Sequence, residues 1–249
     1  MKLIYTLCLT SIVSLTACEK NNGDSCPSSI TVSTDVESPK VGSTATISVT
    51  RQGENDVYHW DGPGLHELNQ QDKLVLYDLK VSQRGWYYCT ADNIDCNTSN
   101  TDSVYLNVQL FQETAACSPP ENTATGNAIP DVTFSSVTKG LDPTWNGISL
   151  EGRGEFGYPP FEVLFNSYNG NKEPEDGVYI TKNIQSFSPF DEPNAISVSF
   201  RYQSMYFHSH PDQKVYVSHV NGKLKAVFCD MSFGGDVPGA RCTGSLTEL

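Results

Sequence analysis

Short segments in which apolar and polar residues alternate recur along most of this 249-residue chain, and none of them has the period of a helix. The clearest is Ala45–Thr50, in which Ala45, Ile47 and Val49 share one side. A period of two places neighbouring side chains on opposite faces of a strand. Because turn-forming residues separate the segments, we expect an all-β protein built from many short antiparallel strands.

Two β domains are predicted, separated by a stretch rich in proline and small polar residues. Residues 26–110 hold enough short strands for a β-sandwich, and residues 111–127 are interpreted as a linker. Residues 128–249 are expected to form a second antiparallel sandwich of jelly-roll type. The predicted strands are Ile30–Thr34, Ala45–Thr50, Val57–Trp60, Leu74–Leu79, Trp86–Cys89 and Val104–Val108, then Val132–Val137, Gly147–Glu155, Phe161–Phe165, Val178–Thr181, Ile196–Tyr202, Tyr206–His210, Lys214–Val220, Lys223–Phe233 and Arg241–Thr247.

The clearest local element is a β-hairpin near the C-terminus. Two alternating segments, Lys214–Val220 and Lys223–Phe228, flank the dipeptide Asn221-Gly222. Asn-Gly is favoured in a two-residue hairpin turn because both turn positions need a positive φ. The register that follows pairs Val215 with Phe228, Val217 with Ala226 and His219 with Leu224.

The first domain carries residues typical of one family. Trp60 stands on the third predicted strand, and Gly85-Trp86-Tyr87-Tyr88-Cys89 lies near the end of the domain. This arrangement resembles the immunoglobulin fold, in which a tryptophan fills the core and a tyrosine two residues before a cysteine bonds back to upstream backbone. Tyr58–Gly64 also resembles the Trp-x-Gly-Pro stretch of Ig-like modules in bacterial surface proteins. The second strand has no cysteine, so Cys89 cannot form the antibody-type bond.

The first eighteen residues have the proportions of an export signal. Lys2 is followed by an apolar run, Leu3–Leu15, and then by a small residue before Cys18. Leu15-Thr-Ala-Cys18 resembles the lipobox of bacterial lipoproteins. That resemblance implies that residues 1–17 are removed, that Cys18 carries the lipid and that residues 18–25 form a tether. The alternative is an ordinary signal peptide with an incidental cysteine.

Export also explains the cysteine content. After Cys8 leaves with the signal and Cys18 is lipidated, an even number remains, which outside the cytosol indicates disulfides with many possible pairings. In the Ig fold the start of the first strand and the loop before the last strand lie at the same end. The resemblance therefore implies Cys26–Cys96, with Cys26–Cys89 as the alternative.

The C-terminal cysteines suggest a second bond. Cys229 and Cys242 lie on strands joined by a glycine-rich loop, and a bond between them would close that loop. Cys89 and Cys117 are then left over. Two interpretations stay open: both are unpaired, with Cys89 a small buried apolar residue, or a bond joins the two domains.

The charge balance excludes some partners. The chain has 16 Lys and Arg against 29 Asp and Glu, and removal of the signal takes away only Lys2. So acidic a surface repels phosphate backbones, so nucleic acid is not an expected partner. The sequence contains no motif that calls for a cofactor, and we expect none.

Two groups of residues are candidate metal ligands. His208 and His210 lie on one face of a predicted strand near Asp212 and His219, and such a set can hold Zn²⁺ or Cu²⁺. The alternative is a solvated histidine patch with no metal, which we favour. Oxygen-rich loops can bind Ca²⁺, but the spacing here fits a solvated hairpin tip better. The loop residues are Asp92, Asn93, Asp95, Asn97, Asn100 and Asp102.

Candidate ligand-binding and catalytic residues lie in the second domain. Aromatic side chains that bracket polar loops can stack on sugar rings, although core packing is the simpler interpretation. Glu151 and Glu155 on one predicted strand form a carboxylate pair of the kind that glycoside hydrolases use, but no nucleophile motif accompanies them. The aromatic candidates are Trp145, Tyr158, Phe161, Tyr168 and Tyr179.

Together these features predict a lipid-anchored protein of the cell envelope, placed in the outer membrane and on either its periplasmic or its outer surface. We expect a binding or structural role without catalysis, with the membrane as a partner through Cys18 and a glycan or protein as ligand. The alternatives are a glycan-binding accessory of polysaccharide uptake, a subunit of a surface fibre or adhesin and a glycoside hydrolase.

Overall fold

The predicted all-β class is confirmed. The structure is a computed structural model that describes residues 29–50, 56–65, 71–93, 96–142, 144, 147–157, 159–166, 172–183 and 193–249. Strands make up most of this part of the chain, with two short 3₁₀-helices, η1 (Val81–Gln83) and η2 (Glu155–Gly157). No helix in these ranges has the length and apolar character needed to span a membrane.

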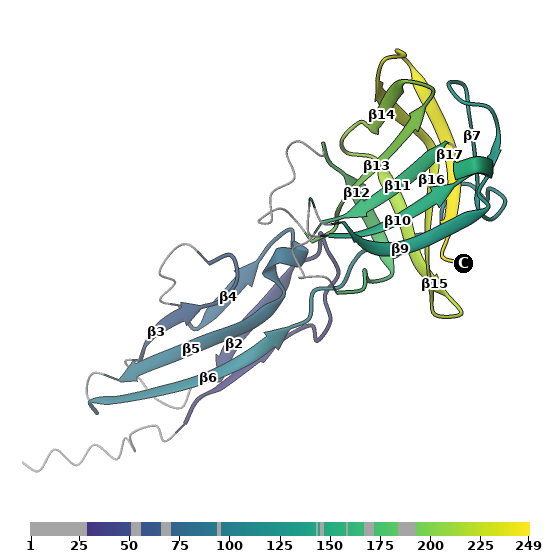
Figure 1. Cartoon of the computed structure of the whole chain (residues 1–249). Helices are drawn as coiled ribbons and strands as arrows, with labels where there is room; N and C mark the ends of the chain where they lie inside the picture. Colours follow the sequence, from purple (N-terminus) through teal and green to yellow (C-terminus); the bar gives the residue numbers. More distant parts are fainter. Residues whose placement is uncertain are drawn as a thin grey trace, which may run out of the picture.

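The N-terminal domain is a sandwich of two three-stranded sheets (Figure 1). One sheet has the order β1-β2-β4 and the other the order β3-β5-β6, with antiparallel pairing throughout. Each predicted segment overlaps one of these strands, but β6 begins at Thr98, inside the stretch predicted as a loop, and not at Val104. Their bounds are β1 (Thr31–Thr34), β2 (Ala45–Thr50), β3 (Asp56–Asp61), β4 (Lys73–Leu76), β5 (Gly85–Asn93) and β6 (Thr98–Leu106).

The predicted core residues fill the space between these sheets. Trp60 is buried and its indole N–H donates to the carbonyl of Gln71 at 2.9 Å. The Tyr87 hydroxyl lies 2.9 Å from the carbonyl oxygens of both Pro63 and Gln83, which is the tyrosine corner that the Ig resemblance implies. Cys89 is buried and unpaired, and burial raises the pKa of its thiol to about 12.

The C-terminal domain is one eleven-stranded sheet that curls around its own core. Its order is β8-β7-β17-β16-β15-β12-β13-β11-β10-β9, and β14 pairs with both β13 and β16. All pairs are antiparallel except β12 with β13. The bounds are β7 (Thr123–Gly126), β8 (Val132–Thr133), β9 (Ser136–Asp142), β10 (Gly147–Arg153), β11 (Pro160–Phe165), β12 (Gly177–Thr181), β13 (Ala195–Tyr202), β14 (Met205–Ser209), β15 (Lys214–Val220), β16 (Lys223–Gly235) and β17 (Ala240–Thr247).

The predicted C-terminal hairpin is confirmed in its register. β15 and β16 pair antiparallel through the turn at Asn221 (φ 53°) and Gly222 (φ 77°), so both turn residues have the positive φ that Asn-Gly tolerates. The observed pairs include Val215 with Phe228, Val217 with Ala226 and His219 with Leu224.

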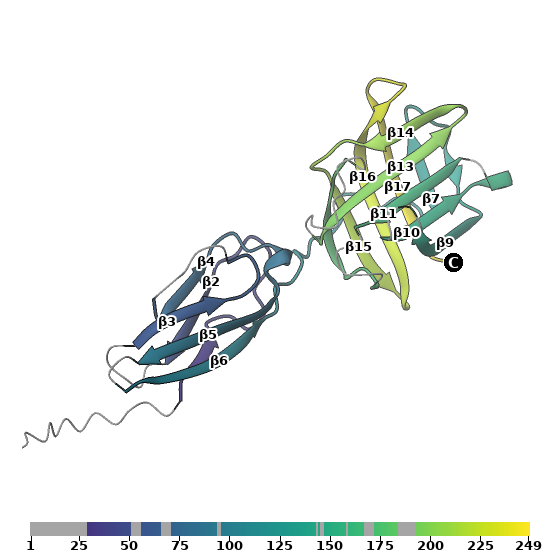
Figure 2. The same ribbon diagram turned by 60° about the vertical axis from the view of Figure 1, so that its left-hand side comes forward.

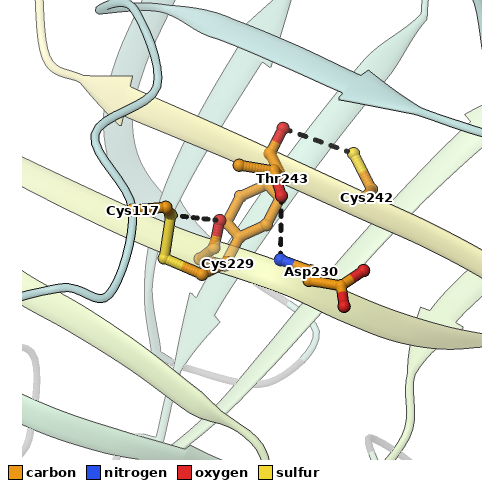
Figure 3. The surroundings of a disulfide bond; sticks show 6 residues. Cys117, Cys229, Asp230, Cys242 and Thr243 are labelled. Atoms are coloured by element: carbon orange, nitrogen blue, oxygen red, sulfur yellow. Dashed lines mark hydrogen bonds between the residues drawn. A yellow bond between two sulfur atoms is a disulfide. The ribbon is translucent and has the colours of Figure 1, made fainter.

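The predicted bond between Cys229 and Cys242 is wrong: Cys229 is bonded to Cys117, with 5.8 Å between the two Cα atoms (Figure 3). A bulge follows Phe228 in the pairing of β16 with β17. Cys229 is only partly buried, whereas Cys242 belongs to the core cluster and is unpaired. Cys242 is the cross-strand partner of Met231, and both belong to the core cluster, so the Cys242 side chain points inward and not toward Cys229.

The C-terminal domain therefore begins inside the stretch predicted as a linker. Cys117 ties that stretch to β16, and β7 pairs with β17. Among the first domain's cysteines, Cys96 is disulfide-bonded, while Cys26, its predicted partner, lies outside the described residues.

The two domains join end to end, and the molecule is elongated (Figures 1 and 2). Arg84, which follows η1, forms a bidentate ion pair with Glu175 of the C-terminal domain, with N–O distances of 2.6 and 2.9 Å. Val81 of η1 packs into the C-terminal core. The amide of Val178 donates to the carbonyl of Phe111 at 2.9 Å. The described chain begins at the end of the first domain that lies away from the second (Figure 2).

Candidate functional site on the outer face of the C-terminal sheet

A row of polar side chains crosses five neighbouring strands, β9, β10, β11, β13 and β14, which lie side by side in Figure 1. Residues that pair in an antiparallel sheet point to the same face. The row is therefore continuous on one face. It consists of Thr138, Glu151, Glu162, Ser199 and His208.

The next row along the same strands points the opposite way and forms the core. Phe161 stacks on Phe200 at a centroid distance of 4.6 Å, and Phe200 stacks on Phe207 at 4.4 Å. Gly152 belongs to this row, where a Cβ would lie about 3 Å from Leu246 and Phe134. We call Phe161, Phe200 and Phe207 the phenyl ladder. Because these rings face the core, the alternate residues of the same strands face outward.

A cavity of about 490 Å³ lies over the outer row. Its walls are mainly polar and come from strands rather than loops, which holds the side chains in fixed positions. The lining residues are Thr138, Gly140, Leu141, Asp142, Ser149, Glu151, Pro160, Glu162, Ser199, Phe200, Arg201 and Tyr206.

The two glutamates at the centre of the row have different electrostatic surroundings. Burial, with repulsion from Asp142 and Glu151, raises the pKa of Glu162, and a hydrogen bond from Ser199 only partly opposes this. Glu151 lies 2.6 Å from the guanidinium of Arg153. The raised pKa of Glu162 favours its protonated, hydrogen-donating form, while Glu151 is in an ion pair with Arg153.

This arrangement suits a ligand with many hydroxyl groups. Hydroxyls need donors and acceptors together, and the cavity supplies both through its carboxyls, the serine and threonine hydroxyls and Tyr206. The cavity is also large enough for a small ligand. Leu141, nearly half exposed, adds an apolar contact at its edge.

The aromatic residues predicted to bind sugar do not line this cavity as a group. Phe161 is fully buried in the phenyl ladder and Tyr179 is buried beside Phe165, so both are core residues and the prediction for Phe161 is wrong. Their strands turn these rings inward. Trp145, Tyr158 and Tyr168 lie outside the described residues, as does Cys18.

The two predicted histidine ligands do come together. Ring atoms of His208 and His210 lie 3.2 and 3.3 Å from the position that a Cβ would take on Gly234. Asp212 pairs instead with Lys182, and His219 with Asp176. Within the described residues no group of three or more His, Cys, Asp or Glu side chains is arranged to hold a metal ion.

The structure bears on two other carboxylate predictions. Glu155 lies in η2 and not on β10, so it does not pair with Glu151; the cross-strand partner of Glu151 is Glu162. The segment from Asp92 to Asp102, for which the sequence favours a hairpin tip over a calcium site, joins β5 and β6, and two of its carboxylates have protein partners, while Asp95 lies outside the described residues. The Asp92 carboxylate lies 3.3 Å from the ring of His59, and the Asp102 carboxylate accepts a hydrogen bond from the backbone amide of Val32 at 2.8 Å.

No family model matches the chain, and no curated protein matches it either. Solved structures overlap it only weakly. A structure described as a mouse coronavirus receptor-binding domain complexed with its murine receptor has 10% identity and a TM-score of 0.28, and the alignment covers 88% of this chain and 98% of the other.

Extracellular domains 3–5 of Drosophila OTK give 11% identity, a TM-score of 0.25 and coverage of 85% and 57% of the two chains. The titin domains z1z2 in complex with telethonin give 12% identity, a TM-score of 0.22 and coverage of 88% of this chain and 96% of the other. At TM-scores this low, none of these likenesses supports an argument about function.

Sequence reasoning missed Glu162 and Asp142. The signal that finds Glu162 is its place in Phe161–Phe165, where it is the one charged residue in an apolar strand. An acidic residue in such a strand either faces solvent or occupies a site. Asp142 ends β9 and reaches the cavity only because β9 and β10 pair, which the sequence does not reveal.

Proposed function

We propose that this chain is a lipid-anchored cell-envelope protein of binding type, and that the cavity over Glu151 and Glu162 takes a glycan. The observation that carries the ligand class is the pairing, on neighbouring strands, of Glu162, a partly buried carboxyl whose pKa is raised, with Glu151, which forms an ion pair with Arg153. A sugar hydroxyl can accept from the first and donate to the second. No charged group on the ligand is needed.

The order of the domains supports the anchoring part of the proposal. The lipobox-like Leu15–Cys18 precedes the first domain, and the described chain enters that domain at the end away from the cavity (Figure 2). With a lipid at Cys18, the Ig-like domain acts as a stalk. The cavity then lies on the half of the molecule that is farther from the membrane.

Metabolic labelling tests the anchor. Cells fed an alkyne analogue of palmitate should label the wild-type protein and not a Cys18→Ala variant, and the mature wild-type protein should lack residues 1–17. A mature protein that starts at another residue, or that stays unlabelled, contradicts the anchor without touching the proposal for the cavity.

A glycan array probed with the purified full mature chain tests the proposed ligand class. Glu162→Ala should weaken binding about tenfold or more because a central hydrogen bond is lost. Glu162→Gln, which keeps a neutral donor, should keep most of the affinity. Glu155→Gln is the matched control, since Glu155 is exposed outside the cavity.

The pH dependence gives this experiment a sign. Because the neutral form of Glu162 is the donor, affinity should be highest below its raised pKa and fall as pH rises through it. The Glu162→Gln variant should not show this fall. If no glycan is retained, or if Glu162→Ala binds as tightly as wild type, the cavity is not a glycan site.

A second function, glycoside hydrolysis, is favoured by the same pair. Protonated Glu162 would give its proton to the glycosidic oxygen, which leaves as an alcohol, while the Glu151 carboxylate attacks the sugar carbon or takes a proton from the water molecule that attacks it. Release of reducing ends from a bound glycan, abolished in both Glu162→Gln and Glu151→Gln, would establish it. Binding without release leaves the protein a lectin-like binder.

A further inference from the structure

Three large aromatic side chains are exposed on the N-terminal domain. Trp86 is 51% exposed, Tyr88 44% and Tyr105 43%. They lie on β5 and β6, whose other face packs Tyr87 and Cys89 into the core. Exposure of one such ring is ordinary, whereas three on adjacent strands form a patch of the kind that marks interaction sites.

The three rings form one surface. Trp86 and Tyr88 are two residues apart on β5 and therefore point to the same face. Tyr105 is the cross-strand partner of Trp86, and the two ring centroids are 5.4 Å apart at 67°. We call Trp86, Tyr88 and Tyr105 the aromatic face.

Polar and acidic residues continue this surface toward the end of the domain away from the second domain. Tyr88 pairs across the sheet with Asp61 on β3 and Ser103 on β6. Farther along, Asp92 lies on the same side of β5 as the rings, beside His59. Tyr88 therefore has a carboxylate and a hydroxyl as its cross-strand neighbours, while Trp86 and Tyr105 are neighbours of each other.

The charge of this sheet is of one sign. The strands β3, β5 and β6 contain no lysine or arginine, and between residues 29 and 110 five basic residues stand against eleven acidic ones. Arg84, at the start of β5, is engaged by Glu175 and by the carbonyl of Val108. The surface is thus electrostatically complementary to a cation.

We propose that the aromatic face, with Asp61 beside it, is a second binding surface that takes a lysine- or arginine-rich segment of a protein partner. Ammonium and guanidinium groups are attracted to the faces of tryptophan and tyrosine rings, and a nearby carboxylate strengthens the contact. The acidic domain steers such a partner toward the surface from a distance. This surface is separate from the cavity of the second domain and does not depend on the ligand proposed there.

Fluorescence titration of the full mature chain tests this surface. The probe is a peptide of alternating lysine and glycine, twelve residues long, and the matched peptides carry serine or glutamate in place of lysine. The lysine peptide should quench the fluorescence of Trp86 and bind, the serine peptide should bind at least about tenfold more weakly, and the glutamate peptide should not bind. Affinity should fall as salt is raised.

Matched variants assign the effect to the aromatic face. Trp86→Ala with Tyr105→Ala should weaken lysine-peptide binding about tenfold, and Asp61→Asn should weaken it to a smaller extent. Tyr77→Ala is the control, because Tyr77 is 73% exposed and directly follows β4, which belongs to the other sheet. All the substituted side chains are exposed, so circular dichroism should show an unchanged fold.

Three results would overturn the proposal. One is equal binding of the lysine and serine peptides. Another is a loss in Tyr77→Ala as large as in the double aromatic variant. The third is quenching of Trp86 by a neutral oligosaccharide with no response to the lysine peptide, which would make the aromatic face a sugar-stacking surface instead.

Discussion

The two domains use aromatic side chains in opposite ways. In the N-terminal domain Trp60 and Tyr87 form the core, while Trp86 and Tyr105 remain outside. In the C-terminal domain the phenyl ladder around Phe161 is wholly inside, and the outer face of the same strands is polar. Both patterns arise from the alternation of side chains along a strand. The exposed row therefore differs in chemistry between the domains: it is aromatic with an acidic neighbour in the first, and it consists of carboxyl, hydroxyl and imidazole groups in the second.

The domains also differ in how their layers are held together. In the first sandwich Cys89 lies in the core without a partner, Cys96 is disulfide-bonded, and the hydroxyl of Tyr87 and the indole of Trp60 donate to backbone carbonyls. The second domain has the Cys117–Cys229 bond from its first segment to a central strand. The described difference is therefore one of place: the second domain has a bond that reaches a central strand, whereas the cysteine in the core of the first sandwich is unpaired.

The largest expected effect is on the phenyl ladder. Phe161→Ala removes a fully buried ring that stacks on Phe200, and it should lower the free energy of unfolding of the C-terminal domain by about 3–5 kcal/mol. Urea unfolding followed by circular dichroism measures this. Phe111→Ala is the matched control, since Phe111 is 47% exposed and should change stability by less than about 1 kcal/mol.

Loss of the disulfide should come next. The bond closes a loop of 112 residues, and replacing both Cys117 and Cys229 by serine should destabilise the second domain by about 2–5 kcal/mol. Hydrogen exchange read out peptide by peptide should show the faster exchange in β7 and β16 and not in β3 or β5. Faster exchange in both domains alike would mean that the domains do not unfold independently.

A smaller effect is expected in the first domain. Tyr87→Phe removes the hydroxyl that reaches the carbonyls of Pro63 and Gln83 and leaves the ring in place. The expected cost is about 1–2 kcal/mol in the unfolding of the N-terminal domain. Tyr88→Phe, an exposed neighbour on the same strand, should cost almost nothing. Equal costs for the two variants would show that the corner does not stabilise the sandwich.

The smallest effect concerns pH. Burial lowers the pKa of His219, but hydrogen bonds to Asp176 and Glu173 outweigh it, so the folded-state pKa is raised above 6.5. Its stabilising contribution is therefore fully present below about pH 6.5 and is lost as pH rises through the folded-state pKa. His219→Gln should cost about a few tenths of a kcal/mol at pH 6 and less at pH 9. A cost that grows with pH would contradict this assignment.

Local patterns predicted much of the fold. Ala45–Thr50 and Lys214–Val220 are strands with the predicted bounds, and the Asn221-Gly222 turn fixed a register that the structure reproduces pair by pair. These features depend on neighbours in the sequence. The Ig resemblance correctly placed Trp60 and Tyr87 because both act within a single small core.

Features that depend on distant strands were not predictable. The strand order of the C-terminal sheet decides that Glu162 lies beside Glu151, and nothing in either segment states that order. The predicted bond between Cys229 and Cys242 was wrong for the same reason. The two cysteines are close in sequence, which favours a bond between them. The bulge after Phe228 and the burial of Cys242 in the core prevent that bond.

The Cys117–Cys229 bond also sets the route of mechanical force through the molecule. If the protein is held at its N-terminal end while a ligand pulls on the second domain, tension reaches that domain through the segment before Cys117. The bond passes this load directly to the middle of β16, which has neighbours on both sides. The outlying strands β7 and β8 are thereby bypassed, so the sheet resists being unzipped from its margin.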